Sequence, residues 1–178
     1  MAMRVLAGTL RGRRLAVPAG QSTRPTSGLV RGSVFNSLAA QGALEGARVA
    51  DLFAGSGALG IEALSRGAAG VVFVERDRAA ARTIAANLES LGLADRGRIV
   101  VRPVERWEPD AVDLVLADPP YGWQGWPGLL GRLHELGDVL VVVEAERPVE
   151  ADGWEVVAHK RHGGTVVSQL RARGAIST

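Results

Sequence analysis

The sequence predicts an α/β fold with a mostly parallel, seven-stranded sheet, and three observations support this class. The chain has 178 residues, enough for one domain that buries a hydrophobic core without disulfides. Hydrophobic residues make up 47% of it and charged residues 22%, which excludes a mainly disordered chain. Short runs rich in Val, Ile and Leu alternate with segments of helical periodicity, as in repeated β-α-β units.

The expected elements follow one another along the chain. Apolar runs without polar alternation predict buried parallel strands at residues 48–53, 70–75, 98–102, 112–117 and 139–144. Apolar side chains spaced by about 3.6 residues predict helices at residues 58–66, 77–91 and 127–136. Asp77 is the expected N-cap of the second helix, and Gly92 follows its end. Residues 154–160 and 164–171, joined by His162-Gly163-Gly164, predict an antiparallel hairpin at the sheet edge.

The first 44 residues have a different character. Residues 4–7 and 13–17 are expected to pair as a short hairpin, and residues 18–25 to form a turn-rich link. Residues 27–40 predict an amphipathic helix. Its expected apolar side consists of Leu29, Val30, Val34, Phe35 and Leu38. We therefore divide the chain into a basic N-terminal extension, residues 1–44, and a single domain, residues 45–178.

Charge is distributed unevenly along the chain, although the net charge is only +2. Residues 1–44 contain six arginines and no acidic residue, and no acidic residue follows Glu155. Basic flanks around a mildly acidic domain indicate a polyanionic partner, with nucleic acid as the first candidate. The alternative is a solvated basic face without a partner. The candidate RNA contacts are Arg11, Arg13, Arg14, Arg24 and Arg31.

Several classes of protein are excluded by composition. With no cysteine, the chain has no disulfide framework, thiolate zinc site or cysteine nucleophile. The three histidines lack the spacing of a metalloprotease motif, so we expect chemistry without a metal. The N-terminus lacks the apolar region of a signal peptide, and no apolar run is long enough to span a membrane. We expect a soluble, cytoplasmic protein.

A glycine-rich turn, DLFAGSGALG at residues 51–60, closes the first strand and opens a helix. Such a turn lets the backbone approach a ligand, and the helix start offers unpaired N–H groups. Asp51 would repel a pyrophosphate but attract an ammonium group, and Glu75 at the end of the second strand suits ribose hydroxyls. Both acids favour S-adenosylmethionine over a dinucleotide. The alternative is a tight turn without a ligand.

The segment Asp118-Pro119-Pro120-Tyr121 follows the fourth predicted strand, at the edge where open α/β sheets bind ligands. The two prolines stiffen the backbone. If the Asp118 carboxylate and the Pro119 carbonyl accept the two N–H bonds of a nucleobase amine, its lone pair points at a methyl sulfonium. Tyr121 offers a face for stacking an extruded base. The alternative is a rigid loop with a buried tyrosine.

Together these motifs resemble a known family. DLFAGSGALGIEALSRGA and DPPY resemble class I S-adenosylmethionine-dependent methyltransferases, which have a Rossmann-like fold. GTLRGRRLAVP, TRPTSGLVRGSVFNSL and GGTVVSQLRAR narrow the resemblance to the RsmD-like family, bacterial 16S ribosomal RNA guanine-N2 methyltransferases. The resemblance implies that the protein acts on 16S rRNA, within a partly assembled small subunit. Since small, basic, single-domain enzymes often act alone, we expect a monomer.

The resemblance also implies site residues. The implied catalytic residues are Asp118, Pro119, Pro120 and Tyr121. The implied cofactor-binding residues are Asp51, Phe53, Ala54, Gly55, Ser56, Gly57, Glu75, Arg76, Val104 and Asp118. Where family members commonly have an adenine-contacting Asn or Asp, this chain has Arg102-Pro103-Val104-Glu105.

Other interpretations stay open. Trp123 and Trp126 are expected to pack in a loop or the core rather than to stack on RNA. DPPY also permits an adenine-N6 or cytosine-N4 DNA methyltransferase. The glycine-rich turn alone permits an NAD-dependent oxidoreductase, and the basic segments permit an RNA-binding module without catalysis.

Overall fold

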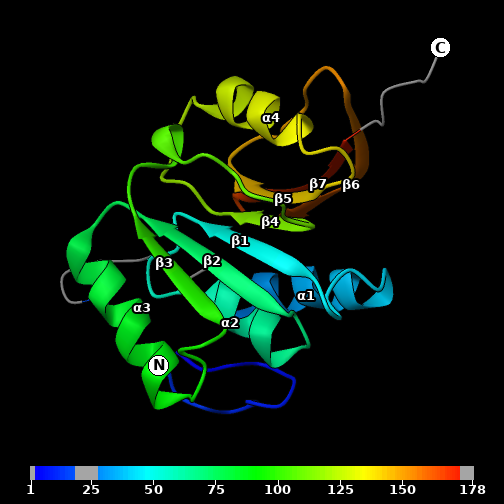
Figure 1. Ribbon diagram of the computed structural model, residues 1–178. Coiled ribbons are helices and arrows are strands. Elements are labelled where there is room, and N and C mark those ends of the chain that lie inside the picture. The colour runs from blue at the N-terminus through cyan, green and yellow to red at the C-terminus, as the bar shows by residue number, and fades with distance from the viewer. Residues whose placement is uncertain (1–2, 19–27, 173–178) are drawn as a thin grey trace.

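The computed structural model describes residues 3–18 and 28–172. Within them, seven strands form one sheet in the order β3-β2-β1-β4-β5-β7-β6 (Figure 1). The strands are β1 (Arg48–Leu52), β2 (Gly70–Glu75), β3 (Gly97–Val101), β4 (Leu114–Ala117), β5 (Leu140–Ala145), β6 (Trp154–His162) and β7 (Thr165–Ala172). β1 to β5 are parallel, whereas β7 lies antiparallel between β5 and β6. The predicted fold class, with its antiparallel C-terminal hairpin, is confirmed.

Helices cover both faces of the sheet. They are α1 (Gly28–Ala40), α2 (Ala58–Ser65), α3 (Arg78–Ser90) and α4 (Trp126–His134), with the short 3-10 helix η1 (Val104–Arg106). Figure 1 shows α1, α2 and α3 below the sheet and α4 above it. Each face buries its own cluster: Leu114 and Leu116 of β4 pack toward α1 to α3, and Val115 and Ala117 toward α4. Burial on both faces explains why the strands are continuous apolar runs.

Most predicted boundaries lie within two residues of the observed ones. Asp77 caps α3 as predicted, since its side chain accepts a hydrogen bond from the Ala80 N–H at 2.8 Å. The predicted apolar side of α1 is wrong at Leu29, which is 84% exposed. Val30, Val34 and Leu38 recur every four residues and form the buried stripe, whereas Leu29 lies to the side of it.

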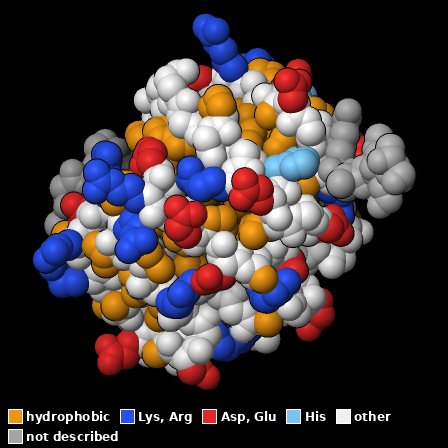
Figure 2. All heavy atoms as spheres, turned by 45° about the horizontal axis from the view of Figure 1, so that its top comes forward, with side chains coloured by type: hydrophobic (Ala, Val, Ile, Leu, Met, Phe, Trp, Pro, Cys, Tyr) orange, Lys and Arg blue, Asp and Glu red, His pale blue; other side chains and the backbone are white. Residues whose placement is uncertain are grey.

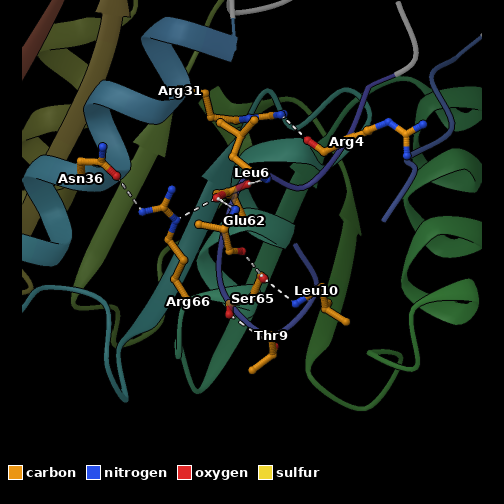
Figure 3. Close-up of polar contacts among 10 residues, drawn as sticks. Arg4, Leu6, Thr9, Leu10, Arg31, Asn36, Glu62, Ser65 and Arg66 are labelled. Carbon is orange, nitrogen blue, oxygen red and sulfur yellow. Dashed lines mark hydrogen bonds and ion pairs between the residues drawn. The ribbon is translucent and has the colours of Figure 1, made fainter. Parts of the chain in front are cut away.

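The N-terminal segment, residues 3–18, pairs across a turn, as the predicted hairpin does, but forms no regular strand. An isolated antiparallel bridge joins Arg4 and Arg14, and three backbone hydrogen bonds of 2.9–3.0 Å link residues 3–5 to residues 12–15. Side chains of α2 also hold this segment in place (Figure 3). The Glu62 carboxylate accepts from the Leu6 and Ala7 N–H groups at 2.8 and 3.1 Å.

The rest of this segment follows the end of α2 and joins the core. The Ser65 hydroxyl donates to the Ala7 carbonyl at 2.6 Å, and the Gly8 backbone lies close enough that a Cβ there would overlap the Ser65 carbonyl oxygen. Val5 and Leu15 are buried in the same cluster as α1 and α2. Within the described ranges, no helix is long and apolar enough to cross a membrane.

Candidate functional site

A cavity of about 1180 Å³ opens at the carboxyl ends of the parallel strands. Its walls come from the ends of β1, β2, β4 and β5, from the loops that follow them and from the β6–β7 turn. Open α/β sheets bind ligands at this edge because the crossovers diverge there. All of the predicted catalytic residues and all but Gly57 of the predicted cofactor-binding residues line this cavity.

Asp51, the first residue of the predicted turn, is buried. One carboxylate oxygen, Oδ2, accepts from the Gly60 N–H at 2.8 Å, and the other, Oδ1, is buried without a partner among the described residues. Burial raises the pKa of the Asp51 carboxyl well above its usual range, and the nearby charges of Asp118 and Glu75 raise it further. A positively charged ligand group beside Oδ1 would relieve this cost.

The backbone of the turn is held in conformations that few side chains adopt. Phe53 has a φ of 59°, and Gly55 and Gly57 have φ values of 56° and 77°. A Cβ on Gly57 would lie 3.3 Å from Phe73 and Ile84, so the turn packs closely on the core. A non-glycine residue in the left-handed region is a local strain that often marks a binding site.

Glu75, at the end of β2, connects the turn to the start of α3. Its carboxylate accepts from the Gly55 N–H at 2.8 Å and from the Asp77 N–H at 2.8 Å. The residue is 8% exposed and lines the cavity. These bonds fix the position of a carboxylate that retains further lone pairs for a ligand.

An aromatic wall closes one end of the cavity beside Val104. The Trp123 indole N–H donates to Glu105 Oε1 at 2.7 Å, which lowers the pKa of the Glu105 carboxyl. The Trp123 ring stands edge-on to Phe53 and to Trp126, with centroids 5.0 and 4.7 Å apart. The two tryptophans therefore pack on each other and on the cavity wall. This agrees with the prediction that they pack within the protein rather than stack on RNA.

The Asp118–Tyr121 segment leaves β4 at the centre of the same edge. All four of its residues line the cavity, and Tyr121 is 56% exposed, so it is not the buried tyrosine of the alternative interpretation. The Pro120 carbonyl accepts from the Trp123 N–H at 3.2 Å. This turn brings the segment back toward the aromatic wall.

The structure adds cavity residues that the sequence did not indicate. They include Met3, Val30, Glu144, His162 and Thr165. Glu144 carried a usable signal, because it ends a predicted buried strand in the same way as Glu75. The others come from segments distant in the sequence, and no local pattern marks them.

Of the predicted RNA contacts, Arg31 lines the cavity. It is 4% exposed and donates to the Arg4 carbonyl, so it lies in the cavity wall rather than on the outer surface (Figure 3). Burial lowers the pKa of the Arg31 guanidinium, partly offset by Glu62. Arg31 is buried because it lies on the buried stripe of α1.

Arg11, Arg13 and Arg14 are exposed and do not line the cavity, and Arg11 and Arg13 lie at the far ends of the helices. The turn at residues 8–12 is bonded to Ser65, the last residue of α2, and Arg13 donates to the carbonyl of Ser90, the last residue of α3. Figure 1 shows this dark blue segment beside those helix ends. Arg24 lies outside the described residues.

Charges of both signs are mixed on one face of the molecule. Figure 2 shows Lys and Arg side chains interspersed with Asp and Glu on the face it presents. Among the described residues, no group of three or more His, Asp or Glu side chains could hold a metal ion.

Comparisons with known proteins agree with this arrangement. The model of the family described as Conserved hypothetical protein 95 matches residues 3–171. Ribosomal RNA small subunit methyltransferase D of Escherichia coli K12 is 40% identical over 186 residues, covering 97% of this chain and 91% of that protein. The YlbH protein of Bacillus subtilis is 38% identical over 165 residues, covering 89% and 83%.

Solved structures show the same fold. The yhhF protein of Escherichia coli has a TM-score of 0.85 at 32% identity, covering 98% of this chain and 99% of that one. An RNA methyltransferase from Salinibacter ruber, in complex with S-adenosyl-L-homocysteine, has a TM-score of 0.66 at 19% identity, covering 79% and 90%. The fold is that of class I methyltransferases. The chain therefore belongs to the family described as Conserved hypothetical protein 95, in agreement with the RsmD-like resemblance of its motifs.

Proposed function

We propose that this protein transfers a methyl group from S-adenosylmethionine to the exocyclic N2 amine of a guanine in 16S ribosomal RNA. One observation supports this most strongly: a single cavity holds both the glycine-rich turn with its two carboxylates and the Asp118–Tyr121 segment. The name of the relatives, ribosomal RNA small subunit methyltransferase D, supports the substrate class and favours RNA over DNA.

The residues present fit the cofactor. The buried Oδ1 of Asp51 suits the ammonium of its methionine part, whereas a dinucleotide pyrophosphate would be repelled there. Gly55, Glu75 and Val104 also line the cavity. The Gly55 backbone would lie next to the ligand, Glu75 would accept from the ribose hydroxyls, and Val104 would border the adenine. When bound, S-adenosylmethionine supplies an electrophilic methyl group on a sulfonium.

The Asp118–Tyr121 segment positions the nucleophile. The Asp118 carboxylate and the Pro119 carbonyl accept the two N–H bonds of the guanine amine, which turns the nitrogen lone pair toward the methyl group. Tyr121 stacks on the extruded base. Asp118 or solvent would accept the proton that the amine loses when it is methylated.

The proposal also covers the state of the substrate, the oligomeric state of the enzyme and its contacts to RNA. The substrate is a partly assembled small subunit in the cytoplasm, and the enzyme acts as a monomer. Residues 1–44 make the contacts to RNA, with Arg11, Arg13 and Arg14 on phosphates outside the cavity. Residues 45–178 carry the catalytic site.

A substitution of Asp118 tests the proposal. With 16S rRNA from a strain that lacks its methyltransferase D, we expect the wild type to incorporate tritiated methyl from S-adenosylmethionine. Asp118→Ala should lower this transfer by at least about 100-fold, because the amine loses its acceptor, while calorimetry shows that S-adenosylmethionine still binds.

The matched control is Asp110→Ala, which removes an exposed carboxylate paired with Arg98 and distant from the cavity. This variant should keep its activity. Turnover by Asp118→Ala at the wild-type rate would contradict the positioning role, and binding of NAD instead of S-adenosylmethionine would contradict the proposed cofactor.

A further inference from the structure

Four polar residues stand in a row across the carboxyl edge of the sheet. Asp118 follows β4, Glu144 lies near the end of β5, and Thr165 and His162 face each other across the β6–β7 turn. The register pairs Ala117 with Val143, so the next residues along these parallel strands, Asp118 and Glu144, lie side by side. Adjacent strands are about 4.8 Å apart. All four residues line the cavity.

Asp118, Glu144 and Thr165 fall on the same face of the sheet. Leu116 of β4 and Val142 of β5 pack toward α1 to α3, and each acid follows two residues later, on the same side of an alternating strand. Val167 of β7 packs in the same cluster, two residues after Thr165. The cavity on this face is completed by Val30 and Arg31 of α1.

We propose that Glu144 is the residue that selects guanine, a role that rests on the proposed function. Guanine presents two neighbouring donors on its Watson–Crick edge, the N2 amine and the N1–H. With Asp118 bound to the amine, the Glu144 carboxylate on the next strand accepts from N1–H. The two neighbouring carboxylates, Asp118 and Glu144, thus match the two neighbouring donors of guanine.

The same pair of carboxylates rejects the other bases that carry an exocyclic amine. In adenine and cytosine, the ring nitrogen beside the amine is an acceptor, which would face the Glu144 oxygens with no proton between them. An unsatisfied, repulsive contact of this kind discriminates more strongly than a missing attraction. Asp118 alone would bind the amine of any of the three bases.

Two further atoms in the cavity wall are consistent with a polar ligand on this side. Among the described residues, Arg31 Nε and His162 Nε2 are buried without a partner. Either atom can donate a hydrogen bond when it carries a proton, and guanine O6, next to N1, is an acceptor. Buried polar atoms without partners are rare and need an explanation such as a ligand.

A base analogue separates this role from a structural one. After the methylated guanine is mapped on 16S rRNA, two stem-loop RNAs are made, one with that guanine and one with 2-aminopurine in its place. 2-Aminopurine keeps the N2 amine but has an unprotonated N1. The wild type should methylate the guanine RNA with a kcat/KM roughly 10- to 100-fold above that for the 2-aminopurine RNA.

Glu144→Gln should reverse part of this preference. Its amide can donate to the N1 of 2-aminopurine, so activity on the guanine RNA should fall at least about tenfold while activity on the 2-aminopurine RNA is kept or rises. Calorimetry should show unchanged affinity for S-adenosylmethionine. The matched control, Glu155→Gln on the exposed side of β6, should leave both activities as in the wild type.

Two outcomes would overturn the inference. One is a wild type that uses both RNAs equally, a result that needs no variant to fold. The other is a Glu144→Gln variant that loses both activities by the same factor. If the wild type methylates no 16S rRNA at all, the proposed function fails, and the role of Glu144 fails with it.

Discussion

At the scale of the residue, Asp51 shows how burial and binding are linked. Its carboxylate is 1% exposed, and a single hydrogen bond from Gly60 compensates only one of its two oxygens. Burial raises its pKa, so the native state holds the proton more tightly than the unfolded chain does. The free energy of unfolding should therefore decrease as pH rises from the unfolded pKa to the raised folded pKa.

Cofactor binding should release this proton. The ammonium group favours the ionised carboxylate, so the affinity for S-adenosylmethionine should rise with pH up to the raised pKa of Asp51 and then level off. Calorimetry in buffers of different ionisation enthalpy measures the protons released. Asp51→Asn should remove the release and the pH dependence together; an equal release from this variant would place the proton elsewhere.

At the scale of the element, α2 carries the N-terminal segment. Glu62 is fully buried and accepts from the Leu6 and Ala7 N–H groups and from Arg66 Nε, the last at 2.8 Å. Arg66 also donates to Asn36 of α1 at 3.1 Å, so one carboxylate connects three parts of the chain (Figure 3). The segment has only a short backbone ladder of its own, and this side chain fixes its position on α2.

Removing the Glu62 carboxylate should be costly. Glu62→Ala leaves two backbone donors and the Arg66 Nε–H without an acceptor, so the free energy of unfolding should fall by about 3–5 kcal/mol. Urea titration measures the loss, and hydrogen exchange should show the Leu6 and Ala7 amides losing protection. Glu89→Ala, exposed on α3, should change stability by less than about 0.5 kcal/mol. Unchanged protection in Glu62→Ala would contradict the role of this carboxylate.

At the scale of the whole molecule, the turn at residues 8–12 and the cavity lie at opposite ends of α2. The turn that carries Arg11 is bonded to the end of α2, whereas the cavity begins at its start. Eight helical residues span about 12 Å, so RNA that reaches both must extend along this side of the molecule. The cavity would hold one base while the arginines hold phosphates of its flank.

Salt dependence tests these contacts. Changing Arg11, Arg13 and Arg14 together to Ser should lower the slope of log K against log salt by about 0.7–0.9 for each lost phosphate contact. A control that changes Arg48, Arg98 and Arg171, each paired with an aspartate, removes the same charge elsewhere. Equal slopes in both variants would indicate a net-charge effect without local contacts.

Most of the secondary structure and the two motifs of the cavity follow from local signals in the sequence. Apolar runs, helical periodicity and the Asp77 cap locate the elements because each depends on residues close together in the chain. The glycine-rich turn and the Asp118–Tyr121 segment are predicted from local sequence too, since each is a short motif at the end of a predicted strand, and both line the cavity.

Tertiary structure alone decided which face of α1 is buried and which distant residues join the cavity. Arg31 and Leu29 exchange their expected surroundings because the packing of α1 on the sheet, rather than its composition, selects the buried stripe. His162 and Thr165 join the cavity because β7 inserts between β5 and β6, a strand order that no local pattern encodes. Hydrophobic periodicity and turn chemistry act over a few residues and are readable in sequence, whereas a cavity is built from contacts between distant segments and exists only once the sheet has assembled.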